Sequence, residues 1–427
     1  MFLEKEGKLI YSYDGETVCI EAWGKDALRV RATKNRSFTG RDWALEAKDA
    51  HAGEVEIFED PSAKGGAFAN MYEGTDTSYG KITNGKLHAV IDSGSVITFY
   101  HEDGRVLLKE HFRRLRDEES MPLNIMGREY SNGVGDNFRI VARFVARKGE
   151  KIFGMGQYQQ HELDLKGCML ELAQRNSQVS VPFYLSSIGY GFLWNNPGVG
   201  QVMFANNGTE WVTESGKEID YLVIAGDTPA EIEENYMTLT GKPPMMPEYG
   251  MGFWQCKLRY WNQEQLLSVA RKYKELGVPL DVIVVDFFHW TKQGEFKFDP
   301  KYWPDVPGMC RELKEMGIQV VVSVWPTVDI YSENFEEMKE KGYLVRTEHG
   351  VPLTMLCGGN EVFFDATNPD ARTYVWEKIK KNYYDQGAKL FWLDVAEPEY
   401  SVYDFKNYRY QLGSVQEVGN IYPKYYL

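Results

Sequence analysis

Short apolar runs separated by Gly, Asp and Asn turns fill the first half of the chain. Alternating or continuous apolar stretches occur at 17–20, 27–30, 88–91, 96–99 and 138–141. Further stretches of the same kind occur at 181–185, 191–194 and 221–224. Runs of this length at hairpin spacing predict antiparallel strands, and their number predicts a β-sandwich.

A helix and a stiff linker are predicted at the end of this β-rich part. Thr228 is a typical N-cap and Pro229 suits the first helical turn, so we expect a helix that runs through Tyr236. The prolines at 243, 244 and 247 then predict an extended linker. We therefore place the N-terminal domain, with its linker helix, at residues 1–241.

Beyond residue 241 the pattern changes to strands that alternate with helices. Strands are predicted at 251–254, 280–286, 318–325 and 390–393, and helices at 262–276, 309–316, 334–341 and 369–386. This alternation predicts a parallel sheet. A smaller doubly wound domain is the alternative, but the glycine-rich phosphate turn of such domains is missing from every strand exit.

An eightfold βα barrel fits the alternation better, although too few residues follow Asp394 for four more strands. The expected fold is thus multi-domain, of β and α/β class. It comprises a β-sandwich over 1–241, then the first half of a (β/α)8 barrel, strands one to four, over 242–427, truncated after the fourth strand.

Carboxylates and aromatic residues gather where the predicted strands end. Trp254, Asp286, Trp325 and Asp394 each stand at or next to a strand exit, and Phe288 follows closely. The exits of barrel strands form the catalytic rim, and sugars bind to aromatic faces and carboxylate oxygens. The competing interpretation is that the tryptophans only fill the core and that the acids only cap the next helix.

Composition and short motifs disfavour several classes of function. The formal net charge of −14 disfavours a nucleic-acid partner, because phosphate binding needs basic grooves. No HExxH, CxxC or Gly-x-Ser-x-Gly motif occurs, so a metal hydrolase, a zinc site and a serine hydrolase are all disfavoured. Neither a signal peptide nor a membrane span is recognisable, and the five scattered cysteines suit a reducing compartment, so we expect a cytoplasmic protein without cofactors or metal.

One segment resembles a known family. The sequence Phe391-Trp392-Leu393-Asp394-Val395-Ala396-Glu397-Pro398 is similar to the nucleophile signature of glycoside hydrolase family 31. Segments 152–157, 171–183, 189–197, 285–288 and 368–371 also resemble that family, so that the similarity covers essentially the whole chain. The resemblance implies a galactose-mutarotase-like β-sandwich before a βα barrel, and a retaining α-glycosidase.

The resemblance also implies roles for individual residues. Asp394 would be the nucleophile, Glu397 its support, Asp286 a partner of sugar hydroxyls, and Asn176 a contact at the non-reducing end. Further substrate-binding candidates are Phe288, Trp325, Trp392 and Trp254. The acid/base aspartate of the family belongs to a Trp-Gly-Gly-Asp or Trp-Ser-Gly-Asp segment, which this chain lacks. We therefore expect the front part of a longer enzyme that is inactive by itself.

The substrate is expected to be an oligosaccharide with an α-xylosyl end. The segments 157–160 and 172–182 are closest to α-xylosidases, and bulky residues beside Asp286 would fill the space of a glucosyl hydroxymethyl group. An α-glucosidase, an α-transglucosylase or a lyase of the same family stays open, as does a homo-oligomer of the complete enzyme. Two other classes also stay open, namely a non-catalytic carbohydrate-binding protein and a metal-dependent lyase that uses Asp286, Asp394 and Glu397.

Overall fold

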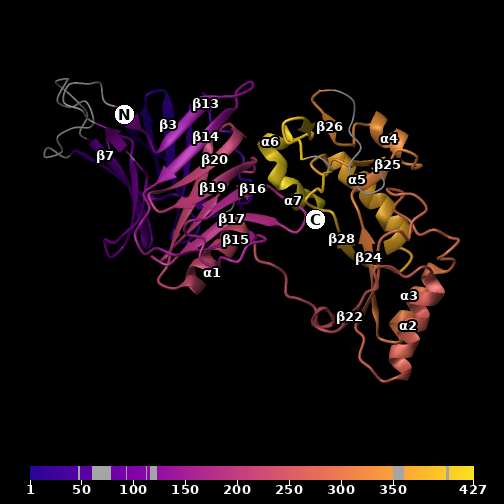
Figure 1. Cartoon of the computed structure of the whole chain (residues 1–427). Coiled ribbons are helices and arrows are strands. Elements are labelled where there is room, and N and C mark those ends of the chain that lie inside the picture. Colours follow the sequence, from indigo (N-terminus) through magenta and orange to yellow (C-terminus); the bar gives the residue numbers. More distant parts are fainter. Residues whose placement is uncertain are drawn as a thin grey trace. The chain divides into compact units, whose positions relative to one another are not determined.

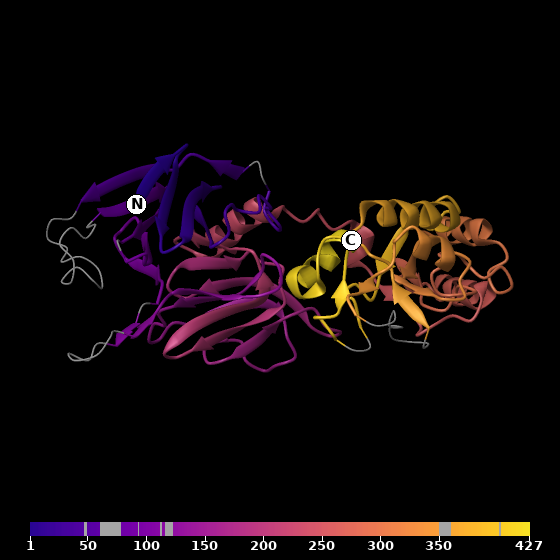
Figure 2. The same cartoon turned by 90° about the horizontal axis from the view of Figure 1, so that it is seen from above.

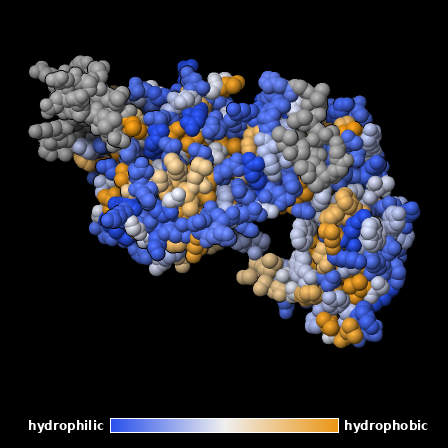
Figure 3. Space-filling model, in the orientation of Figure 1, coloured by the Kyte–Doolittle hydropathy of each residue, from blue (hydrophilic) through white to orange (hydrophobic). Residues whose placement is uncertain are grey.

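The computed structural model shows two compact units, residues 1–243 and 244–427 (Figure 1). We refer to them as the β unit and the α/β unit. The described residues are 1–46, 49–59, 78–92, 94–111, 113–115, 123–349, 360–400 and 403–427. Hydrophilic residues cover most of the visible face of each unit, as the high content of charged residues leads one to expect (Figure 3).

The β unit is built from three main antiparallel sheets. The largest follows the order β1 (Phe2–Lys5), β2 (Lys8–Tyr13), β3 (Glu16–Trp23), β4 (Ala27–Thr33), β21 (Ile219–Ala225), β18 (Tyr190–Trp194), β17 (Val179–Ser186) and β15 (Ile152–Gln157), with β5 (Ala50–His51) on β3. The second contains β10 (Val106–Lys109), β9 (Ile97–His101), β8 (Leu87–Ile91), β7 (Ser78–Asn84) and β6 (Glu54–Glu59). The third contains β13 (Arg128–Asn132), β14 (Phe138–Phe144), β20 (Gly208–Gly216), β19 (Gly200–Ala205) and β16 (Met169–Leu172), and a separate pair joins β11 (Arg113–Leu115) to β12 (Leu123–Ile125).

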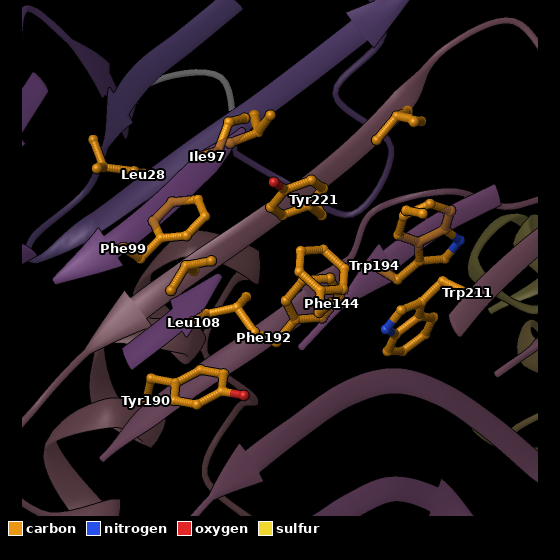
Figure 4. Close-up of a cluster of buried hydrophobic side chains, with 14 of the residues drawn as sticks. Leu28, Ile97, Phe99, Leu108, Phe144, Tyr190, Phe192, Trp194, Trp211 and Tyr221 are labelled. Carbon is orange, nitrogen blue, oxygen red and sulfur yellow. The ribbon is translucent and has the colours of Figure 1, made fainter. Parts of the chain in front are cut away.

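One core joins these three sheets. Aromatic side chains dominate it (Figure 4): the rings of Trp194 and Trp211 stack with their centroids 5.5 Å apart, and Phe144 meets Phe192 edge to face at 5.3 Å. The Trp194 indole N–H donates to Thr213 Oγ1 at 3.2 Å, which satisfies a polar group that burial would otherwise leave unpaired. Antiparallel sheets packed around one apolar core confirm the predicted β-sandwich.

The predicted linker helix is α1 (Pro229–Thr240), four residues longer than expected. Thr228 caps it as predicted, because its hydroxyl accepts the Glu231 N–H at 3.2 Å. Ile232 and Leu239 on its buried face belong to a second, smaller apolar cluster with residues of β17, β18 and β21.

The α/β unit contains a four-stranded parallel sheet in the order β22 (Trp254–Gln255), β23 (Val282–Val285), β24 (Gln319–Val324) and β28 (Leu390–Leu393). The helices α2 (Gln263–Glu275), α3 (Val306–Glu315) and α5 (Pro369–Ile379) flank it, and α4 (Phe335–Glu340) follows β24 (Figures 1 and 2). The alternation of strand and helix that the sequence predicts is therefore present. A helix is also expected from Ile421 to the last residues, and α7 (Tyr422–Tyr426) is present there. Smaller elements were not predicted: η2 (Glu248–Met251), β25 (Thr327–Asp329), β26 (Arg346–Thr347), β27 (Glu361–Phe363), η3 (Lys380–Tyr384), β29 (Tyr408–Arg409), α6 (Val415–Val418) and η4 (Gly419–Ile421).

Several expected elements differ from the structure; α3, for example, begins at Val306 rather than at residue 309. The helix predicted over 369–386 ends at Ile379 and continues as the π-helical turn η3, which places the buried Tyr383 against His289. The strand predicted over 251–254 pairs only from Trp254 onward, because Met251 still belongs to the 3-10 turn η2 that follows Pro247.

Candidate active site

Strand register brings three of the predicted residues to one edge and one face of the parallel sheet. Val284 pairs with Val321, and Val321 pairs with Leu390. Side chains alternate along a strand, so residues an even number of positions further on share that face. The residues that do so at the carboxyl ends of β23, β24 and β28 are Asp286, Trp325 and Asp394.

Asp394 follows β28 directly and is half-buried. Its backbone N–H still donates to Val324 O at 3.0 Å, which extends the sheet by one residue. The indole N–H of Trp325 donates to Oδ2 at 3.1 Å, and the Val395 N–H donates to Oδ1 at 2.9 Å. Each carboxylate oxygen therefore has a fixed donor, which holds the group in one orientation.

The backbone is unusual at both acidic strand exits. Val395, directly after Asp394, has φ +59°, and Phe288, two residues after Asp286, has φ +61°. The left-handed region is disfavoured for bulky residues and above all for β-branched ones, and such conformations cluster at functional sites. Here both left-handed residues lie within two positions of a predicted site carboxylate.

Asp286 is held by two neighbours. The Phe287 N–H donates to Oδ1 at 2.8 Å, and the thiol of Cys256, at the exit of β22, donates to Oδ2 at 3.3 Å. Burial raises the pKa of Cys256 to about 12, and the hydrogen bond and charge of Asp286 act in the same direction. The thiol therefore keeps its proton at neutral pH and can act as a donor.

His289 holds the backbone of Asp286 through a hydrogen bond. Its Nδ1–H donates to the Asp286 carbonyl at 2.9 Å, and its Nε2 accepts from the Tyr383 hydroxyl, also at 2.9 Å. Burial lowers the pKa of His289 to about 4, so the ring is neutral at pH 7. A neutral ring matches both partners, because it has one N–H for the carbonyl, which can only accept, and one bare nitrogen for the hydroxyl, which donates.

Aromatic rings cluster next to the two acidic strand exits. The centroid of Trp325 lies 5.4 Å from that of Phe287 and 6.2 Å from that of Phe288, and Trp290 lies 6.0 Å from Trp325. Phe288 is 46% exposed, whereas Trp325 is half-buried. Phe288 and Trp325 thus lie together with Asp286 and Asp394, as the sequence predicted.

The other two predicted tryptophans line an apolar groove further from the strand ends. It has a volume of about 450 Å³, and its walls include Tyr249, Trp254, Leu390 and Trp392. Trp254 pairs with Val282, four positions before Asp286, so it stands about 13 Å of strand below the rim. Trp392 pairs with Ser323 one layer below Asp394 and is 49% exposed. The structure does not bring Trp254 together with the two aspartates, and a sugar contact there stays a prediction.

Glu397 and Asn176 occupy different surroundings. Burial raises the pKa of Glu397, and the charges of Glu399 and Asp394 raise it further; within the described part of the chain its Oε2 has no hydrogen-bond partner. Asn176 is exposed in a turn of the β unit between β16 and β17, where its Oδ1 accepts from the Ser177 hydroxyl at 3.0 Å. Its approach to the sugar stays a prediction.

Sequence reasoning missed Cys256, His289 and Tyr426. Cys256 lies two positions after Trp254, so strand alternation could have placed its side chain on the same face as that of Trp254. Nothing in the sequence pairs His289 with Tyr383, 94 residues away. Tyr426 in α7 donates to Val324 O at 2.9 Å beside Asp394, a contact between segments 102 residues apart.

Other chemistry finds little support among the residues that the structure describes. They include no group of three His, Cys, Asp or Glu side chains that could hold a metal ion. Four cysteines, Cys19, Cys168, Cys256 and Cys310, are free thiols, and Cys357 lies outside the described residues. None of the helices in the described ranges has the length and apolar character needed to cross a bilayer.

Comparison with known proteins gives a consistent result for both units. Residues 243–427 match the profile of the glycosyl hydrolases family 31 TIM-barrel domain, and residues 17–202 match that of the glycosyl hydrolase 31 N-terminal galactose mutarotase-like domain. An uncharacterized family 31 glucosidase, ORF2 of Pseudescherichia vulneris, is 45% identical over 99% of this chain and 78% of its own length.

Two α-xylosidases are also similar. The α-xylosidase A of Aspergillus niger is 30% identical over 96% of this chain and 58% of its own length. The crystal structure of a family 31 α-xylosidase from a soil metagenome, complexed with xylose, superposes with a TM-score of 0.92 at 50% identity. The match covers all of this chain and 62% of that protein, so the chain spans about three fifths of these two α-xylosidases.

Proposed function

The chain belongs to glycoside hydrolase family 31, and on that basis we propose that the enzyme that carries it is a retaining α-glycosidase with Asp394 as its nucleophile. The observation that supports this role is the position of Asp394 at the exit of β28, with Trp325 and Val395 each donating to one of its oxygens. An ionised carboxylate in a fixed orientation is what attack on an anomeric carbon requires.

The reaction we propose has two steps. A carboxylate oxygen of Asp394 forms a bond to the anomeric carbon while the bond to the leaving oxygen breaks, and a carboxylic acid protonates that oxygen. Water then attacks the same carbon, gives its proton to the acid's conjugate base, and releases the Asp394 carboxylate. The net configuration at the anomeric carbon is retained, because it is inverted twice.

Asp286 is the residue that we propose to bind the sugar hydroxyls. Its oxygens already accept from the Phe287 N–H and the Cys256 thiol. An ionised carboxylate has about four acceptor positions, so about two remain for hydroxyl donors of a substrate. Glu397, which follows Asp394 on the same strand exit, would support the loop rather than contact the sugar.

A substitution of the nucleophile tests the proposal in the complete enzyme. Asp394→Ala should lower kcat by on the order of a thousandfold or more. Azide should restore turnover and yield the β-glycosyl azide, since the small anion attacks from the vacated side. Glu397→Gln serves as the nearby control and should keep most of the activity. Wild-type-like turnover by Asp394→Ala without azide would overturn the assignment.

We propose an α-xyloside as the substrate. Two similar proteins are named α-xylosidases, and Phe288 presents a large, half-exposed ring beside Asp286 where a hydroxymethyl group would need room. An α-glucosidase is the alternative, since the relative from Pseudescherichia vulneris is named a glucosidase. Phe288→Ala should shift the ratio of kcat/KM for α-xyloside over α-glucoside toward the glucoside by at least tenfold, because such pocket effects are about 1–3 kcal/mol. An unchanged ratio would contradict the steric account.

The proton donor of the first step is not assigned to a described residue. Glu397 leaves the sheet three positions after Asp394, and Asp286 is engaged by two donors. We therefore propose that residues 1–427 alone do not hydrolyse a glycoside, and cleavage of an α-xyloside by them would refute this.

The cellular location is a separate proposal. The four free thiols suit a reducing compartment, and we propose the cytoplasm.

A further inference from the structure

We infer that the loop between β22 and α2 carries a binding platform for the leaving-group sugar, built from Trp261 and Arg259. This inference deepens the proposed function and rests on it. Trp261 is 59% exposed, yet its backbone is fixed: its N–H donates to Gln265 Oε1 at 2.7 Å. Asn262 caps α2 by accepting the Gln265 N–H at 2.9 Å. A large ring exposed on a rigid helix start suits ligand stacking, since little flexibility is lost when it binds.

The guanidinium of Arg259 lies over this ring. Its guanidinium carbon is 3.8 Å from the centroid of Trp261 and 5.3 Å from that of Phe288. Among the described residues Arg259 forms neither a hydrogen bond nor an ion pair, although the chain has 62 acidic residues against 48 Lys and Arg. The two rings therefore hold the guanidinium in place, while its N–H groups have no acceptor among the described residues.

The platform is continuous with the proposed site. Phe288 contacts Arg259 on one side and Trp325 on the other, at a centroid distance of 6.2 Å, and Trp325 donates to Asp394. Exposure increases along this path, from the half-buried Trp325 through Phe288 to Trp261. A sugar bonded to the residue being cleaved must lie on the solvent side of the nucleophile, and this path leads there.

The chemistry of the pair fits a neutral sugar ring. The C–H face of a pyranose packs on an indole, and its hydroxyl oxygens accept from a guanidinium. The xylosyl unit that reacts would lie between Asp394 and Asp286, and the next sugar would rest on Trp261 with hydroxyls toward Arg259. Trp261 and Arg259 would then set the preference for oligosaccharides over substrates with a small leaving group.

Kinetics with two substrates test this in the complete enzyme. Trp261→Ala should lower kcat/KM at least tenfold for an α-xylosyl-capped oligosaccharide but less than twofold for α-xylosyl fluoride, whose leaving group is one atom. Trp261→Phe should keep most of the kcat/KM for the oligosaccharide. Arg259→Ala should give a kcat/KM for the oligosaccharide between those of Trp261→Ala and Trp261→Phe. The control is Trp376→Ala, a similarly exposed tryptophan on α5 that packs on Tyr384 and Phe391. Equal losses with both substrates would overturn the platform.

Binding without turnover separates this inference from the proposed function. In an Asp394→Asn background, calorimetric titration should show at least tenfold weaker oligosaccharide binding after Trp261→Ala, with xylose binding unchanged. This result supports the platform even if no α-xyloside is hydrolysed, in which case the proposed reaction alone fails. Unchanged oligosaccharide affinity overturns the platform whatever the enzyme hydrolyses.

Discussion

Asp286 and Asp394 differ at the residue scale in what holds them. Each carboxylate accepts from the backbone N–H of the residue that follows it, but the second donor is an indole from the neighbouring strand exit for Asp394 and a thiol for Asp286. The sequence could place both acids at strand ends. It could not show these partners, because each is set by register between segments 30 to 69 residues apart.

The thiol of Cys256 provides the first test at this scale. Cys256→Ala removes a donor to Asp286 and should lower kcat/KM about threefold to tenfold, as one hydrogen bond contributes roughly 0.5–1.5 kcal/mol. Cys256→Ser keeps a donor at the same position and should restore most of the rate. Kinetics of both variants with one α-xyloside would measure this. Equal effects of the two substitutions would show that size, not hydrogen bonding, matters.

His289 predicts a pH dependence of stability. Burial lowers its pKa to about 4 in the folded state, while the unfolded value is near 6.5. Below pH 6.5 His289 becomes protonated in the unfolded chain but stays neutral in the folded one. The free energy of unfolding therefore falls as the pH drops from about 6.5 to 4. The total loss of unfolding free energy is about 3 kcal/mol once the pH is below both pKa values. His289→Gln should make the loss between pH 6.5 and 4 smaller. Thermal midpoints at pH 7.5 and 4.5 would measure it, and an unchanged slope would contradict this account.

At the element scale, strand β28 and the start of α5 follow directly from the sequence. The strand was predicted at 390–393 and spans Leu390–Leu393, and Asn368 caps α5 ahead of Pro369 as its residue type suggests. The sequence does not reveal the π-helical turn η3 or the level of Trp254. Both depend on tertiary contacts, since Tyr383 meets His289 and Trp254 pairs with the first residue of β23.

The cap of α5 offers a test of this element. Asn368 Oδ1 accepts the Asp370 N–H at 3.0 Å and the Ala371 N–H at 3.4 Å. Asn368→Ala should lower the free energy of unfolding by about 1 kcal/mol. Asn368→Asp keeps the acceptor and should cost much less. Denaturant unfolding of the three proteins would settle the point, and a loss as large for Asp as for Ala would argue against capping.

At the scale of the whole molecule, a β-sandwich and a parallel βα unit could both be predicted, because each has its own hydrophobic period. The sandwich is recognisable from short alternating runs, and the second unit from four strands each followed by helices. The family profiles match the same two parts of the chain. The role of Asn176 stays a prediction, since it lies in the β unit and the two aspartates lie in the α/β unit.

The proposed mechanism requires Asp394 to bond covalently to the anomeric carbon of the substrate. The most direct measurement is mass spectrometry of peptides from the complete enzyme after reaction with 5-fluoro-xylosyl fluoride, which slows release of the intermediate. The account predicts one added fluoro-xylosyl group on the peptide that contains Asp394, and no label in Asp394→Asn. Labelling of another carboxylate, or steady turnover of a good substrate with no label on Asp394, would contradict it.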